Sequence, residues 1–200
     1  MTTSINFSAS AALFMDFQND ICNKGGRMLS GEEEVIGRFE KTRENALTLL
    51  TKLRERKMPL AHVAHLAGEK EPLAWRDSGM ESYVKKVGAF KKDDPGTSIV
   101  EELAPMADEP IFWKTTFSAL GNIELVNWLK SKKINTLILS GVVSHYVVLA
   151  TAFSAFDNDF RVVVVSDCCT SASIDSHNTS MNILAPMADI VTVSEICNQL

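Results

Sequence analysis

Hydrophobic positions along the chain form two kinds of segment that alternate. Short continuous apolar runs, rich in β-branched residues, are typical of strands buried on both faces of a parallel sheet. Six runs of this kind are predicted to be strands, at 11–15, 60–65, 111–113, 136–139, 161–166 and 190–193. Longer segments with apolar residues at helical spacing predict helices at 31–57, 120–131, 146–156 and 175–185.

Alternating strands and helices predict a three-layer α/β/α fold. Right-handed crossovers place helices on both faces of a mainly parallel, six-stranded, Rossmann-like sheet. Region 67–95 is predicted to be a polar loop, and 99–103 a short helix at most. No Gly-, Ser- or Pro-rich linker divides the 200 residues, which favours a single domain over 1–200.

Composition narrows the class of protein. The net charge of −5 is mild and no basic run exceeds two residues, which argues against a nucleic-acid partner. No apolar stretch approaches the ~20 residues that span a bilayer, and residues 1–10 lack the features of a secretory signal. The four cysteines show neither a disulfide framework nor zinc-ligand spacing: Cys22, Cys168, Cys169 and Cys197. We therefore expect a cytoplasmic protein that binds no membrane.

The stretch 135–157 combines a buried strand, a tight turn and a buried helix. Ser144 is predicted to cap the helix, which would leave the N–H groups of His145, Tyr146 and Val147 unpaired at the positive end of the helix dipole. Such a helix start can hold an anion or a developing oxyanion. Many parallel α/β proteins have the same turn without any chemistry at it, so this pattern alone does not show whether the turn is a functional site.

Three positions converge at the carboxyl ends of predicted strands, where open parallel sheets bind ligands. Asp16 follows the first strand, Lys114 the third, and the helix start near Val147 the fourth. A carboxylate and an ammonium that face each other in a cleft can share protons. From the spacing alone, a buried salt bridge that fixes two loops explains the pair as well.

Four motifs in order along the chain carry a resemblance to a known family. They are FMDFQND at 14–20, KTTFSA at 114–119, SGVVSHYVVLATAFSAF at 140–156 and RVVVVSDCCTS at 161–171. Together they resemble the isochorismatase-like hydrolase superfamily, which includes nicotinamidases, carbamoylsarcosine amidases and isochorismatases. Most members have a catalytic triad of aspartate, lysine and cysteine. The resemblance implies that Asp16 and Lys114 are the first two members of that triad.

The third member of the triad is missing. In the family pattern the cysteine lies six residues after a glycine and precedes Val-x-x-Thr-Ala, which places it at Val147 when counted from Gly141. A valine offers no nucleophile, and removing one from an enzyme that forms a covalent intermediate costs on the order of 10⁶ in rate. Given this resemblance, we do not expect cysteine-type amidase activity.

True isochorismatases work without this cysteine, because they hydrolyse a vinyl ether. In that branch the aspartate protonates the enolpyruvyl methylene and water adds to the oxocarbenium ion, which requires a general acid and no thiol. His145 resembles this branch, although it can also be an ordinary residue of the first helical turn. Thr116 stands against it, since isochorismatases have an arginine there that suits a dicarboxylate substrate.

Further site features follow from the same resemblance. A cis peptide is expected between Val142 and Val143, beside the oxyanion site. The substrate pocket is expected to include Phe17, Gln18, Trp75, Phe117 and His145. Nicotinamidases hold a metal ion with an Asp-x-His motif, whereas this chain has only His62 and His65 in that region. No metal and no other cofactor is therefore expected.

Two hypotheses remain open. The first is an isochorismatase-like hydrolase of a small molecule, in which Asp16 is the general acid or base and Lys114 tunes it. The second is a catalytically silent family member that binds a metabolite or serves as an oligomer subunit. In either case the resemblance implies a small-molecule ligand and a homo-oligomer, a dimer or a tetramer.

Overall fold

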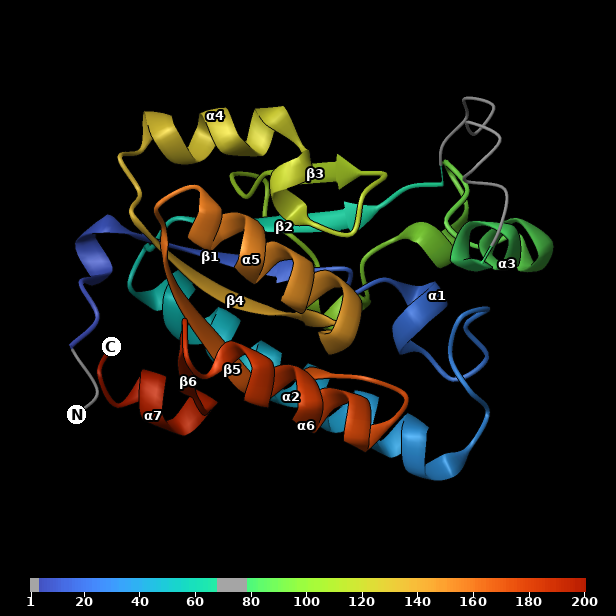
Figure 1. Cartoon of the computed structure of the whole chain (residues 1–200). Coiled ribbons are helices and arrows are strands. Elements are labelled where there is room, and N and C mark those ends of the chain that lie inside the picture. The colour runs from blue at the N-terminus through green and yellow to red at the C-terminus, as the bar shows by residue number, and fades with distance from the viewer. Residues whose placement is uncertain (1–3, 68–78) are drawn as a thin grey trace.

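The computed structural model describes residues 4–67 and 79–200, and its six strands form one sheet (Figure 1). Their order is β3-β2-β1-β4-β5-β6, and every neighbouring pair is parallel. The strands are β1 (Ser10–Met15), β2 (Leu60–His65), β3 (Ile111–Lys114), β4 (Thr136–Val142), β5 (Arg161–Thr170) and β6 (Asp189–Val191). The chain reverses its direction across the sheet between β1 and β4, which is where ligands bind in such sheets.

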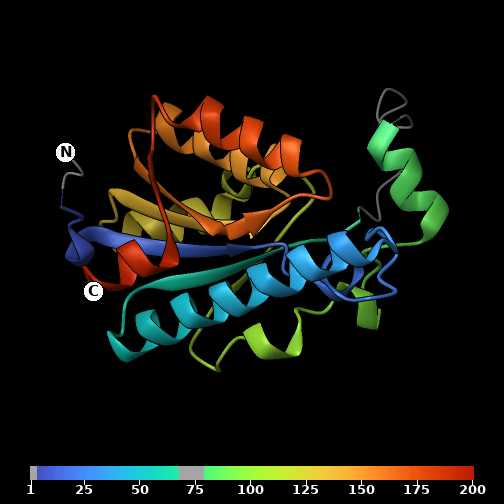
Figure 2. The ribbon, with the colours of Figure 1, turned by 90° about the horizontal axis from the view of Figure 1, so that it is seen from below.

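Helices cover both faces of the sheet, as Figure 2 shows. Helices α2 and α7 lie on one face, and α4, α5 and α6 lie on the other (Figures 1 and 2). The helices are α1 (Asn19–Cys22), α2 (Glu33–Glu55), α3 (Gly79–Val87), α4 (Ile123–Ser131), α5 (Leu149–Asp157), α6 (Ile174–Leu184) and α7 (Val193–Cys197). This architecture confirms the predicted α/β fold with a six-stranded parallel sheet.

Strand β1 supplies side chains to two separate hydrophobic cores. Phe14 packs in the core under α2 with Phe39, whereas Leu13 packs in the core under α4 and α5 with Leu129 and Ala152. The alternation follows from the two-residue period of a strand. Burying one such side chain contributes about 1.5–3 kcal/mol, so both faces of β1 are fixed in the sheet.

The predicted polar loop at 67–95 was wrong in part, because α3 lies within it. A small hydrophobic cluster attaches this helix to the segment after β1, since Val84 and Phe90 pack against Ile21 and Met28. Figure 1 shows α3 beyond the carboxyl ends of β1, β2 and β3. The helix is therefore stabilised by distant contacts that a local polarity pattern does not report.

Several strand ends also differ from the prediction: β3 continues to Lys114, and β4 continues to Val142, past the expected end at 139. Strand β5 continues to Thr170, past the expected end at 166, because its last residues pair with the end of β4. Strand β6 ends at Val191, and Val193 begins α7 instead of closing the strand. Thr192 and Glu195 form a capping box there, which starts the helix.

A buried carboxylate ties α2 to the sheet. Glu109 accepts hydrogen bonds from Arg54 Nε at 2.7 Å, from Arg54 Nη2 at 2.8 Å and from the N–H of Met106 at 2.9 Å. Its Oε2 also lies 3.2 Å from His62 Nε2. Burial acts to raise the pKa of Glu109, but these hydrogen bonds outweigh it and lower the pKa to about 2. The carboxylate thus fixes the segment before β3 to α2.

Replacing Glu109 with glutamine should lower the free energy of unfolding by about 2 kcal/mol, because it removes charged hydrogen bonds from a buried site. The matched control is Glu55→Gln, whose partner Lys52 lies 2.8 Å away on the exposed face of α2. That change should cost under about 0.5 kcal/mol. Urea unfolding of both variants at pH 7 measures the difference, and equal losses would refute the role given to Glu109.

None of the helices in residues 4–67 and 79–200 combines the length and apolar composition that a membrane crossing requires.

Candidate active site

Asp16 and Lys114 form a buried ion pair at the carboxyl edge of the sheet. Asp16 directly follows β1 and Lys114 ends β3, with β2 between the two strands. Lys114 Nζ lies 2.7 Å from Asp16 Oδ2. Only 1% of the Lys114 side chain and 4% of the Asp16 side chain are exposed. Lys114 Nζ also donates to the carbonyl oxygen of Thr116 at 3.1 Å. The two predicted residues therefore meet directly.

Burial makes Asp16 a carboxyl group that holds its proton unusually well. Removal from water raises the pKa of Asp16 above its ordinary value of 3.8, although the charge and hydrogen bond of Lys114 act to lower it. Asp16 Oδ1 is buried and has no hydrogen-bond partner among the described residues. One carboxyl oxygen is thus held by Lys114 and the other is left to a ligand.

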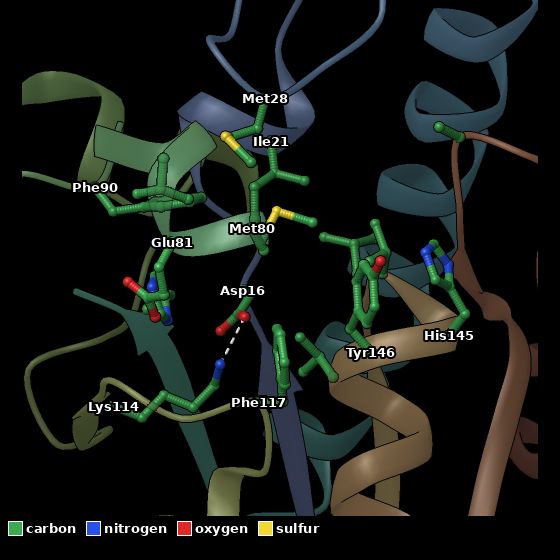
Figure 3. Close-up of a pocket in the computed structure, with 16 residues that line it drawn as sticks. Asp16, Ile21, Met28, Met80, Glu81, Phe90, Lys114, Phe117, His145 and Tyr146 are labelled. Atoms are coloured by element: carbon green, nitrogen blue, oxygen red, sulfur yellow. Dashed lines mark hydrogen bonds and ion pairs between the residues drawn. The ribbon is translucent and has the colours of Figure 1, made fainter. Parts of the chain in front are cut away.

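A cavity of about 270 Å³ opens above this pair (Figure 3). In that view Phe90 and Glu81 lie on one side of the opening, and Tyr146 and His145 lie on the other. The described lining residues are mostly apolar: Asp16, Ile21, Met28, His65, Met80, Glu81, Val84, Phe90, Lys114, Phe117, Val142, Val143, His145, Tyr146, Val147 and Ala172. The cavity spans the point where the strand order reverses, because it includes residues after β1 and β4.

Buried polar side chains after β1 hold the cavity wall in place. The amide of Gln18 bonds both the N–H and the carbonyl of His65 and the carbonyl of Thr97, each at 2.8 Å. Asp20 accepts the N–H of Phe90 at 2.8 Å. It also accepts from Arg27 at 3.2 Å. The segment after β1 therefore fixes both the end of β2 and the loop that carries Phe90.

The predicted pocket residues divide into three groups. Phe117 and His145 line the cavity. Phe17 and Gln18 do not: Phe17 packs in the core against Phe14, and Gln18 is fully buried in the hydrogen bonds just described. The reason is the turn at Asp16, whose φ of 57° directs the following residues away from the cavity. Trp75 lies outside the described residues.

The turn after β4 differs from the sequence-based expectation in its hydrogen bonds. The peptide between Val142 and Val143 is cis, and both residues line the cavity. However, the N–H groups of Tyr146 and Val147 donate to the carbonyl of Val143, at 3.2 and 3.0 Å. The expected anion site on these two amides was wrong, because the helix begins one residue earlier than predicted, with Val143 as its N-cap, and the carbonyl of Val143 accepts both N–H groups.

Ser144 does not cap the helix, contrary to the prediction. Its hydroxyl lies 2.8 Å from Nδ1 of His177 on α6, so it joins two helices instead. Gly141 lies just before the turn, and a Cβ there would stand 2.6 Å from the carbonyl oxygen of Met15. The missing side chain at Gly141 therefore lets β4 approach the end of β1 closely.

The histidines near the cavity are neutral at pH 7. Burial, together with the charge of Lys114, lowers the pKa of His65 to about 3. Burial also lowers the pKa of His145, whose Nδ1 lies 2.9 Å from the hydroxyl of Ser171. His62 is buried beside Glu109 and does not line the cavity. Within residues 4–67 and 79–200, no group of three or more His, Cys, Asp or Glu is placed to hold a metal ion.

None of the four cysteines is among the described cavity residues. Cys22, Cys168 and Cys169 are buried, and burial raises the pKa of each thiol, that of Cys169 to about 12. A thiol with a raised pKa is a poor nucleophile. By contrast, the side chain of Val147 lines the cavity.

Sequence reasoning missed the outer wall of the cavity. Met80, Glu81 and Val84 come from α3, within the region predicted to be a loop. A signal was present there, because Met80, Tyr83, Val84 and Val87 have the i, i+3, i+4, i+7 spacing of an apolar helical face. Phe90 and Met28 had no such local signal.

Comparison with known proteins places the chain in a family. A family model described as the isochorismatase domain matches residues 10–195. The uncharacterized isochorismatase family protein YddQ of Bacillus subtilis (strain 168) is 25% identical over 165 residues, which cover 82% of this chain and 79% of YddQ. The chain therefore belongs to the isochorismatase family, whose members are hydrolases of small molecules.

Other similar proteins agree with this assignment. The maleamate amidohydrolase of Pseudomonas putida is 27% identical over 142 residues, covering 69% of this chain and 66% of that enzyme. Several other curated relatives are matched over only 28–48% of their own length. The crystal structure of a cysteine hydrolase from Pseudomonas syringae pv. phaseolicola 1448A has a TM-score of 0.86 and 19% identity, and the match covers 100% of this chain and 98% of that one. It shows the same fold.

Replacing Lys114 with methionine should lower the free energy of unfolding at pH 7 by about 3 kcal/mol, because it leaves a buried carboxylate without its partner. The pKa of Asp16 is already raised in the folded state, and this change should raise it further. A carboxyl group whose pKa is raised in the folded state destabilises the fold progressively as the pH rises above its ordinary value of 3.8, so stability should recover as the pH falls from 7 toward 4.

The control for this prediction is the double variant Asp16→Asn, Lys114→Met, which has no ionisable group at the pair. Its free energy of unfolding, measured by urea titration across the same pH range, should lack the recovery on acidification. Identical pH slopes for the single and double variants would show that Asp16 does not titrate as described.

Proposed function

We propose that this chain hydrolyses a small molecule by acid–base chemistry of Asp16 and Lys114, without a cysteine nucleophile. The observation that supports this most is the buried pair at the floor of the cavity, with Asp16 Oδ1 unpartnered and the pKa of Asp16 raised. A carboxyl group in this condition can donate a proton to a ligand and take one back. Lys114 then stabilises the carboxylate that forms.

An enol ether is the substrate type that this chemistry fits. Asp16 transfers its proton to the terminal carbon of the double bond, and the electron pair of the ether oxygen stabilises the cation that results. A water molecule forms a bond to the cationic carbon and returns a proton to Asp16. The hemiketal then breaks its carbon–oxygen bond to the ether oxygen while the proton of its hydroxyl passes to that oxygen, which releases an alcohol and a ketone and leaves Asp16 protonated for the next cycle. None of these steps requires a thiol.

Val147 argues against the covalent route that uses an amide substrate. By the resemblance in the 141–152 segment, Val147 occupies the nucleophile position, and its side chain lines the cavity. A thiolate would have to attack the amide carbon from there. Relatives such as maleamate amidohydrolase are amidases by name, so the loss of a nucleophile would separate this chain from them in chemistry.

Thr116 argues against a dicarboxylate substrate such as isochorismate. Its hydroxyl donates to the carbonyl oxygen of Ser118 at 2.8 Å, so it serves the loop after β3. Thr116 is not among the described cavity residues, and it carries no charge. The substrate therefore differs from that of the isochorismatases that have arginine at this place.

A catalytically silent, metabolite-binding member of the family is the second candidate. The valine at the nucleophile position favours it, because the cavity is intact while one expected catalytic group is absent. A homo-oligomer, dimer or tetramer, fits either candidate. Exposed aromatic side chains of α5 support this: Phe153 and Phe156.

Asp16→Asn separates the two candidates. For the hydrolase, the variant should lose at least about 10³-fold in kcat against whichever enol ether or amide the wild-type protein turns over, because the acid is removed. Ligand affinity should change little, since asparagine keeps the shape of the side chain. Purified protein assayed on a panel of both substrate types, with calorimetric binding, provides the measurement. Wild-type protein that binds ligands and turns over none would favour the silent member.

Val147→Cys tests the nucleophile position. A thiol at this place should create measurable hydrolysis of small primary amides, because it would face Asp16 and Lys114 across the cavity. The matched control is Val148→Cys, since Val148 is the next residue, is buried and does not line the cavity. Folded Val147→Cys protein that iodoacetamide labels but that hydrolyses no amide would refute the assignment of Val147 to this position.

A further inference from the structure

We infer that the substrate of this site carries a cationic nitrogen group beside its reactive part, and that Glu81 and the aromatic rings at the mouth of the cavity bind this group. The inference depends on the proposed function only in calling the ligand a substrate. The ligand class follows from the charges and rings that line the cavity.

The charged side chains of the described part of the cavity wall carry no excess positive charge. Among the described lining residues these are Asp16, Lys114 and Glu81. Asp16 and Lys114 are bonded to each other, so with Asp16 ionised the three sum to −1, and with Asp16 protonated to zero. An anionic ligand would meet the Glu81 carboxylate without gaining a cation of its own.

The two histidines of the cavity do not change this balance. Burial and the charge of Lys114 lower the pKa of His65 to about 3, and burial lowers the pKa of His145. Both rings are thus neutral at pH 7, and each already has a neighbour. His65 meets Phe90 edge-on with ring centres 5.0 Å apart, and His145 lies 2.9 Å from the hydroxyl of Ser171.

Aromatic faces and soft sulfur atoms surround the mouth. The rings of Phe117 and Tyr146 are stacked with centres 5.0 Å apart, and about half of Phe117 and a third of Tyr146 remain exposed. In the view of Figure 3, Phe90 lies beside Glu81 on one side of the opening and Tyr146 lies on the other side. Met80 lies between the two rings in that view. Such faces attract alkylammonium groups, which lose little by leaving water for an aromatic surface.

Glu81 has a position that suits a ligand contact as well as a helix contact. It lies in the first turn of α3, where the helix dipole favours an acidic residue whether or not a ligand binds. However, its neighbours Met80 and Val84 also line the cavity, so this face of α3 points toward the site. A carboxylate on that face is the one acidic group of the described wall that Lys114 does not hold.

The cavity volume limits the size of the ligand. About 270 Å³ is just below the range for small-molecule sites, which runs from about 300 to 1,000 Å³. A compact organic cation with one apolar body is small enough for this volume. It can contact the Asp16–Lys114 pair at the floor of the cavity and Glu81 and the aromatic rings at its mouth.

Three soluble probes that differ in charge test the inference by calorimetry at pH 7: benzyltrimethylammonium, benzyl alcohol and phenylacetate. Wild-type protein should bind the cation most tightly. Glu81→Gln should weaken binding of the cation about fivefold to tenfold, because a charged contact at a partly desolvated site is lost, and should leave the binding of benzyl alcohol unchanged.

Glu124→Gln is the matched control, because Glu124 is an acidic residue in the first turn of another nine-residue helix, α4, and does not line the cavity. It removes the same charge from an equivalent helical position, so any change common to both variants reports on net charge or helix stability. Affinity for the cation should be unaffected in this control.

The inference is overturned if phenylacetate binds more tightly than the cation, if no probe binds, or if Glu81→Gln leaves the affinity for the cation unchanged. Failure of the proposed function has a different signature, because it would appear as intact binding of the cation without turnover of any substrate. Thermal melts of both variants verify that each is folded before binding is compared.

Discussion

Two opposite charges removed from water at one edge of the sheet are the constraint on which the rest of this structure depends. Asp16 and Lys114 are separated by 98 positions in the chain and meet at 2.7 Å because the sheet order places β1 and β3 on either side of β2. Burying two such groups costs several kcal/mol each, and only accurate geometry offsets that cost. The parallel sheet and the polar side chains after β1 provide this geometry.

The fold could be predicted from the sequence to a large extent because its signals are local. The apolar runs mark all six strands, and their alternation with helices dictates a parallel sheet. What the sequence did not predict depends on contacts between distant segments. Helix α3 was missed because its apolar spacing lies inside a long region rich in polar and turn residues, and β5 extends to Thr170 through pairing with β4.

The site could be predicted only in part, for the same reason. Asp16 and Lys114 were identifiable, since residues at the carboxyl ends of parallel strands gather at one edge. The orientations of Phe17 and Gln18 were not, because they depend on the left-handed backbone of Asp16. The hydrogen bonds of the Ser144–Val148 turn were also beyond prediction, since a π turn and an ordinary helix start have the same apolar pattern.

The cavity combines features that the family resemblance alone would not connect. The ion pair of Asp16 and Lys114 lies at its floor, a valine lies in its wall where the resemblance implies a cysteine, and Glu81 and aromatic rings lie at its mouth. In the proposed mechanism, which uses no thiol, reactivity depends on whether Asp16 can hold and release a proton. Burial supports that ability, and Lys114 limits how far the pKa rises.

The most direct test of the account is the pKa of Asp16 itself, measured by carbon-13 NMR of the carboxyl carbon in aspartate-labelled protein. The spectrum of Asp16→Asn protein assigns the signal, since only that resonance should be missing. The account predicts titration above the ordinary value of 3.8, at a pH that changes when a cavity ligand binds. Titration below 3.8 would contradict it, because Asp16 would then be a permanently ionised partner of Lys114 with no proton to give.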